Sequence, residues 1–168
     1  KITLPRHELK DLLQGANRVL PRSATLPILK AVRFTAKAGR LTATVTDLEQ
    51  ALSYRFEAAP TGDAVFVVDS KHLAPLAKGK DDDPVVFEVL PDHRLGITNT
   101  VGGHGILTRV DLMDATEWPA DPCEVKTQSV DPLFLTHLRS AARFASTDES
   151  RHVLNSVFLD HAVKAGMT

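Results

Sequence analysis

PRHELKDLLQGANRVL at residues 5–20 and ILKAVRF at residues 28–34 indicate the fold of the first part of this chain. In the first segment apolar side chains recur every three or four residues, which predicts an amphipathic helix with one buried side. Pro5 suits the first position of a helix, where a missing N–H costs nothing. The second segment is rich in β-branched and aromatic residues and predicts a strand. Two more strands are expected at 40–46 and 51–57, since both runs have strand composition and are bounded by turn residues.

The same arrangement recurs further along the chain. A strand expected at 64–68 leads into a second helix, for which Ser70 is the expected N-cap and in which Pro75 should produce a kink. Three strands are expected after it, at 85–90, 94–99 and 105–112. The chain therefore repeats a module of strand, helix and three strands. Internal repeats of this kind indicate a pseudo-symmetric architecture, here of the α+β class.

A third module begins after the proline-containing linker 114–123. A strand at 124–130 should precede a helix with Asp131 as N-cap and Pro132 as first residue, and a strand at 153–159 should follow it. The side chains that this helix should bury are Leu135, Leu138, Ala142 and Ala145. We therefore expect one complete domain over residues 1–122 and the incomplete start of a second over 123–168, as in a piece of a longer chain.

The composition is that of a folded protein, with 43% hydrophobic and 24% charged residues among 168. No apolar run is long enough to span a bilayer, and no signal-peptide pattern opens the chain, so we expect no membrane association. The single cysteine, Cys123, excludes an internal disulfide and fits a reducing compartment, which favours a cytoplasmic location.

Positive charge is concentrated in the three expected helices. The chain has a net charge of −1, which by itself argues against nucleic acid, whereas the segments 5–22, 70–80 and 132–146 carry +2, +3 and +2. Such helices suit the phosphates of a duplex, while an acidic exterior would repel DNA from the outside. Lys and Arg are also common on any solvated helix face, so that alternative stays open for each residue. The candidate DNA-binding residues on these helices are Arg6, Lys10, Arg18, Arg22, Lys71, Lys78, Arg139 and Arg143.

Patterns for catalysis or cofactor binding are weak. Seven histidines have no metal-ligand spacing, and Cys123 has neither a second cysteine nor a nucleophile motif around it. Gly102-Gly103 lies between two expected strands, so a hairpin turn is favoured over a phosphate loop. Asp81-Asp82-Asp83 is interpreted as a solvated turn rather than a cation site. We therefore expect no catalytic residue, no metal and no cofactor, and a small hydrolase of unrelated mechanism remains as the enzyme alternative.

Four clusters of residues resemble one known family, in the same order and spacing. These are TLPILKAVRF at 25–34, TDLEQALSYRFEA at 46–58, EWPADP at 117–122 and FASTDESRHVLNSVFLD at 144–160. Together they resemble the beta sliding clamp of bacterial DNA polymerase III. The sequence departs from the family pattern at Ser156, where the family has glycine, and at Arg22, which stands three residues rather than two before the threonine of the first cluster.

The resemblance implies a DNA-clamp fold, with antiparallel sheets outside and helices lining a concave inner face. It implies a non-catalytic processivity factor: a homodimeric ring, loaded by a clamp loader, that tethers DNA polymerase subunits to double-stranded DNA. Arg151 becomes a further DNA-binding candidate, and Leu154 matches a family leucine beside the cleft that receives polymerase peptides. A role for Leu154 as an ordinary core residue remains open. The alternative function is a clamp-derived protein-interaction scaffold that is not loaded onto DNA.

Overall fold

The computed structural model describes residues 1–57, 60–120, 131–148 and 150–159. The chain divides into two compact units, Lys1–Asp121 and Pro122–Thr168, which are described separately below. The expected strand at 124–130 and Cys123 lie outside the described residues. In the part of the chain that the structure describes, no helix is both long and apolar enough to cross a membrane.

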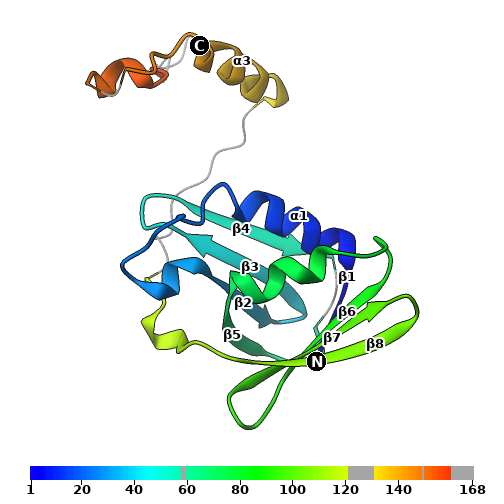
Figure 1. Ribbon diagram of the computed structural model, residues 1–168. Coiled ribbons are helices and arrows are strands. Elements are labelled where there is room, and N and C mark those ends of the chain that lie inside the picture. The colour runs from blue at the N-terminus through cyan, green and yellow to red at the C-terminus, as the bar shows by residue number, and fades with distance from the viewer. Residues whose placement is uncertain (58–59, 121–130, 149, 160–168) are drawn as a thin grey trace, which may run out of the picture. The chain divides into compact units, whose positions relative to one another are not determined.

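The first unit contains the repeated module twice (Figure 1). The first copy consists of β1 (Ile2–Pro5), α1 (Arg6–Ala16), the 3-10 turn η1 (Pro27–Lys30), β2 (Ala31–Lys37), β3 (Arg40–Thr46) and β4 (Ala51–Phe56). The second copy consists of β5 (Ala64–Asp69), α2 (Ser70–Leu73), the 3-10 turn η2 (Ala74–Ala77), β6 (Pro84–Val89), β7 (Arg94–Val101) and β8 (His104–Asp111). A short 3-10 turn, η3 (Ala115–Glu117), follows. The predicted α+β order of elements is confirmed, including all six strands that were expected after the first two helices.

The two modules exchange their first strands. The described strands form two antiparallel four-stranded sheets, with the orders β1-β6-β7-β8 and β4-β3-β2-β5. Strand β1 pairs with β6, with Ile2 opposite Phe87, while β5 pairs with β2, with Phe66 opposite Phe34. Each module therefore completes the sheet of the other, so neither can form its sheet alone.

One continuous core lies between the two sheets and the helices. Side chains alternate along β2 and β3, so that Phe34 and Leu41 face the core. The Phe34 ring lies 5.0 Å from that of Phe66 and 5.6 Å from that of Phe87, measured between centroids. Because Phe87 belongs to the other sheet, this aromatic cluster joins the two sheets.

The first helix begins and ends inside its predicted limits. Pro5 is the last residue of β1 and the N-cap of α1, not its first helical residue, because its backbone is extended (ψ 143°) and still pairs with Pro84. The helix ends at Ala16, and the expected apolar residues Leu9, Leu12 and Ala16 are buried.

The second helix is short and changes type at the predicted kink. Its N-cap is Asp69 and not Ser70, because the Asp69 carboxylate accepts a hydrogen bond from the Lys71 N–H. The α-helical part ends at Leu73, and the chain continues as the 3-10 turn η2, in which Pro75 lacks the N–H that an α-helix would need there. Leu73 and Leu76 anchor this segment in the core.

Two turns and one aromatic residue agree with their sequence interpretation. Val101 and His104 pair across a two-residue hairpin turn at Gly102-Gly103, where both glycines have positive φ. Residues 81–83 form a turn. Trp118 is buried in a second small cluster with Ile28, Leu29, Ala31 and Val67, so it packs the start of the linker against the first unit.

The second unit differs from prediction in two respects. Helix α3 (Pro132–Ala142) has the predicted N-cap, since the Asp131 carboxylate accepts from the Leu133 N–H. Its apolar side is not buried, however: Leu135 is 54% exposed and Ala142 is exposed, because the described residues of this unit include no strand to cover them. The prediction of a strand at 153–159 is also wrong. Residues His152–Asn155 form the 3-10 turn η4, and no strand follows in the described part of that segment.

Candidate nucleic-acid interface

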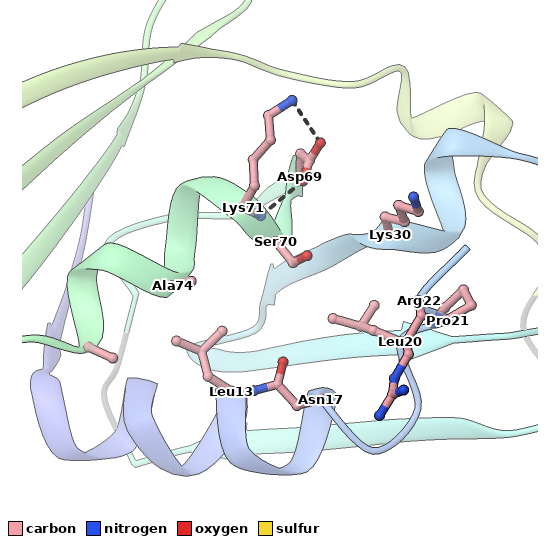
Figure 2. Close-up of a pocket in the computed structure, with 11 residues that line it drawn as sticks. Leu13, Asn17, Leu20, Pro21, Arg22, Lys30, Asp69, Ser70, Lys71 and Ala74 are labelled. Atoms are coloured by element: carbon pink, nitrogen blue, oxygen red, sulfur yellow. Dashed lines mark hydrogen bonds and ion pairs between the residues drawn. The ribbon is translucent and has the colours of Figure 1, made fainter. Parts of the chain in front are cut away.

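A groove runs between α1 and the α2–η2 segment on the first unit (Figure 2). Helix α1 supplies Leu13, its C-cap is Asn17, and the loop after it supplies Pro21. The opposite side is built by the first residues of α2 and by Ala74 and Ala77 of η2. The groove has a volume of about 770 Å³ and is open to solvent. It is the place where the two cationic helical segments of the sequence come together.

Three basic side chains line this groove. Arg22 comes from the loop after α1, Lys30 from η1 and Lys71 from the first turn of α2 (Figure 2). Arg22 and Lys71 were sequence candidates, whereas Lys30 was not. The sequence predicts one strand over residues 28–34, whereas the 3-10 geometry of Pro27–Lys30 brings Lys30 to the groove.

One acidic residue stands among these cations. Asp69 caps α2 and forms an ion pair with the Lys71 ammonium, with 3.0 Å between Nζ and Oδ2. Partial burial raises the pKa of Asp69, but hydrogen bonds from the Lys71 N–H and ammonium group outweigh this and hold its pKa below the ordinary value. Asp69 is therefore ionised at neutral pH and partly neutralises Lys71, so Arg22 and Lys30 are the groove cations that carry uncompensated charge.

Arg6 does not face DNA, which corrects the sequence prediction. Its side chain is 0% exposed and lies among backbone carbonyl groups. Its guanidinium donates to the Leu76 carbonyl (3.1 Å), to the Lys78 carbonyl at the end of η2 and to the Thr100 carbonyl of β7. A guanidinium can donate five hydrogen bonds, so it satisfies carbonyls that the end of a helical turn leaves unpaired. Arg6 is a structural residue that ties α1 to η2 and β7.

Lys10 lies one turn further along α1 and is partly engaged. Its ammonium forms an ion pair with Asp81 and donates to the Gly79 carbonyl at 3.2 Å. The hydrogen bond that the Lys10 ammonium donates to the Asp81 carboxylate, together with the Lys10 charge, holds the pKa of Asp81 below its ordinary value. Since the Lys10 side chain is 37% exposed, it remains accessible at the edge of the helix surface.

The remaining candidates are distributed over both units. Arg18 and Lys78 are exposed on the helical side of the first unit. In the second unit, Arg139 is exposed on α3 and Arg143 is its exposed C-cap. Arg151 is exposed, and Leu154 is 51% exposed, which in this chain is not the burial of a core residue.

A comparison with known protein families identifies the family of the first unit. Residues 1–119 match the family described as "DNA polymerase III beta subunit, N-terminal domain". The chain belongs to this family. A comparison with curated protein sequences found no match.

Solved structures of beta subunits have the same fold. One is the pol III beta of Caulobacter crescentus, with 25% sequence identity and a TM-score of 0.72 over 92% of this chain. Another is the beta subunit of Thermotoga maritima, with 26% identity and a TM-score of 0.67 over 89% of this chain. The beta subunit of Streptococcus pyogenes, at 18% identity and a TM-score of 0.71 over 90% of this chain, shows the fold alone. The chain spans 41%, 40% and 41% of these three proteins, respectively.

The chemistry available in this clamp-family domain is that of phosphate contact. Arg, Lys and hydroxyl groups bind phosphate oxygens in any sequence, whereas reading bases requires side chains that reach into a groove of the duplex. The groove between α1 and α2 has no aromatic side chain. Its polar groups are the three cations, Asp69, Asn17 and Ser70, and the rest of its lining is aliphatic. Among the described residues, no group of three or more His, Cys, Asp or Glu side chains is arranged to hold a metal ion.

Proposed function

We propose that this chain is part of a processivity clamp, a non-catalytic, ring-shaped protein that tethers DNA polymerase to duplex DNA without regard to sequence. Family membership supports the replication role. The observation that supports DNA contact is the cationic helical surface of the first unit, where Arg18, Arg22, Lys30 and Lys78 are not engaged by an acidic partner within the described residues. We assign contacts with the duplex phosphates to these residues and, in the second unit, to Arg139, Arg143 and Arg151.

Weak and exchangeable contacts suit this role. Each neutralised phosphate releases a counterion, so affinity from such contacts falls steeply with salt and carries no sequence information. A protein that must move along DNA therefore gains from having few phosphate contacts and from a closed topology that prevents escape. Lys10 and Lys71, which are paired with Asp81 and Asp69, contribute less than the unpaired cations in this arrangement.

The edge of one sheet supports assembly into a ring. Strand β8 is the last strand of the sheet β1-β6-β7-β8, and nothing among the described residues pairs with its outer edge. Ile106 and Leu107 on this strand are 54% and 57% exposed. An open edge with apolar side chains favours pairing with another chain. We infer that the complete protein closes as a homodimer, is loaded by a clamp loader in the cytoplasm and binds polymerase subunits, with Leu154 beside the polymerase-binding cleft.

Charge reversal on the helical surface tests DNA contact. In the native polypeptide that carries this segment, Arg22→Glu should shorten the half-life on nicked circular duplex at roughly physiological salt, because a phosphate contact becomes a repulsion. The control is Arg94→Glu, which makes the same charge change at an exposed position on β7, where Arg94 pairs with Asp92. Its half-life should stay near that of the unchanged protein.

The pair Arg139→Glu and Arg143→Glu applies the same test to α3. A clamp should lose retention when both are reversed. If retention and its salt dependence are the same in these variants as in the unchanged protein, the chain is the scaffold alternative and does not hold DNA through these helices.

A further inference from the structure

A second cationic surface lies on the face of the sheet β4-β3-β2-β5 that points away from the helices. Along β2, Phe34 and Ala36 enter the core that also contains Leu9 and Leu12 of α1, so the alternate residues Thr35 and Lys37 point outward. The same alternation turns Arg40, Thr42 and Arg55 of β3 and β4 outward. We call the set Thr35, Lys37, Arg40, Thr42 and Arg55 the outer cationic patch.

The strand register brings these side chains together. Thr35, Thr42 and Arg55 stand opposite one another across three neighbouring strands, and Lys37 stands directly opposite Arg40 at the end of the hairpin. Together with Ala38, the five residues line a shallow depression of about 420 Å³. The side chains therefore form one surface feature and are not scattered cations.

The charge of the outer cationic patch is not compensated. Lys37, Arg40 and Arg55 form no ion pair within the described residues, and the nearby Asp63 carboxylate accepts from the Ala38 N–H instead. On the other sheet, by contrast, the exposed Arg94 is paired with Asp92. Like charges directly opposite one another destabilise a strand pair, and Lys37 and Arg40 are such a pair. A bound anion would offset the repulsion between Lys37 and Arg40.

The dimensions fit the backbone of duplex nucleic acid. Three strands at a spacing of about 4.8 Å give a width of roughly 10 Å. One strand of a duplex has one phosphate per about 3.4 Å of helix axis, and because it winds around that axis its neighbouring phosphates lie roughly twice this rise apart, so the patch spans about two phosphates. The two threonine hydroxyls are additional phosphate donors, and the absence of an aromatic side chain from the patch gives unstacked bases nothing to stack on.

We propose that the outer cationic patch is a second DNA-contact surface, which binds the phosphodiester backbone of a duplex on the face opposite the helices. The patch is a local exception to the acidic exterior that the sequence predicts. The patch needs no closed ring, so it can be tested on short linear duplexes independently of the clamp function.

The test compares two double variants of the full chain by fluorescence anisotropy with a short duplex over a range of salt concentrations. Arg40→Gln/Arg55→Gln removes two arginines from the patch. Lys1→Gln/Arg94→Gln removes two exposed cations that lie outside the patch, the helices and β8, and is the matched control. The slope of log K against log salt should become less steep by about 1.8 in the first variant, or 0.9 for each lost phosphate contact, and stay constant in the control.

Four results would overturn the proposal. One is equal loss of affinity in the patch variant and the control, which would indicate a general charge effect. Another is an unchanged slope in the patch variant. A third is competition by polyglutamate at the same charge concentration as duplex, which would make the patch a surface for acidic peptides. Stronger binding of single-stranded than of duplex DNA would likewise contradict the rigid phosphate spacing on which the assignment rests.

Discussion

Replacing Arg6 by alanine is expected to lower the free energy of unfolding of the first unit by about 3–5 kcal/mol. The substitution removes a fully buried guanidinium that donates to the Leu76, Lys78 and Thr100 carbonyls. These carbonyls would be left without a partner, and Asp83, whose carboxylate lies 3.8 Å from the guanidinium, would lose its cation. Unsatisfied buried polar groups are costly because neither water nor protein replaces the lost hydrogen bonds.

The surroundings of Arg6 leave little room for adjustment. Gly79 has φ +127°, and a Cβ atom at this position would lie 2.5 Å from Arg6 Nη1, so the backbone passes directly over the guanidinium. The control is Lys10→Ala, one turn further along α1, which removes an exposed ion pair and should cost less than about 1 kcal/mol. Urea denaturation monitored by Trp118 fluorescence measures both variants. A loss below about 1 kcal/mol for Arg6→Ala would show that the carbonyl cluster is not a stabilising feature.

Phe34→Ala is expected to lower the free energy of unfolding of the first unit by about 3–5 kcal/mol, because it leaves a cavity at the centre of the aromatic cluster. Phe34 is fully buried, and its ring stacks on those of Phe56 and Phe66 in its own sheet. It also contacts Phe87 of the other sheet, so the cavity would open between the two sheets. Because the modules exchange strands, we expect both sheets to unfold in one transition in this variant.

The control for Phe34→Ala lies on the neighbouring strand. Val65 of β5 is 55% exposed and points away from the core, so Val65→Ala should change the stability by less than about 0.5 kcal/mol. The measurement is denaturation followed both by far-UV circular dichroism and by Trp118 fluorescence. Two separate transitions in Phe34→Ala would mean that the sheets are independent, contrary to the interlocked topology.

Local patterns in the sequence predicted the elements well. The helical spacing of Leu9, Leu12 and Ala16 predicted α1, and the turn residues around 40–46 predicted β3 at its observed limits. The N-cap Asp131 was identified because capping depends on a side chain and the backbone two or three residues ahead. Such interactions are local and can be recognised in the sequence, although the predicted cap of α2, Ser70, is one residue after the observed cap, Asp69.

Non-local pairing could not be predicted in this way. The exchange of β1 and β5 between modules depends on which sheet edge each strand meets, and strands with similar composition fit either edge. The burial of Arg6 has the same origin, because its partners lie about 70 and 94 residues away in the chain. The outer cationic patch was missed since its members come from three strands and become neighbours only through the register. Charges that a helix segregates are visible in the sequence, whereas charges that a sheet gathers are not.

We propose that the complete protein is held on DNA by topology, with the cationic helices only in light contact with phosphates. To test this, the native polypeptide that carries this segment is loaded onto nicked circular duplex and onto the same duplex after linearisation. The fraction of protein retained on each DNA is then followed at physiological salt. We predict retention for many minutes on the circle and rapid loss from the free ends of the linear form. Equal loss from the two substrates would contradict the claim, because binding would then depend on contact strength and not on a closed ring.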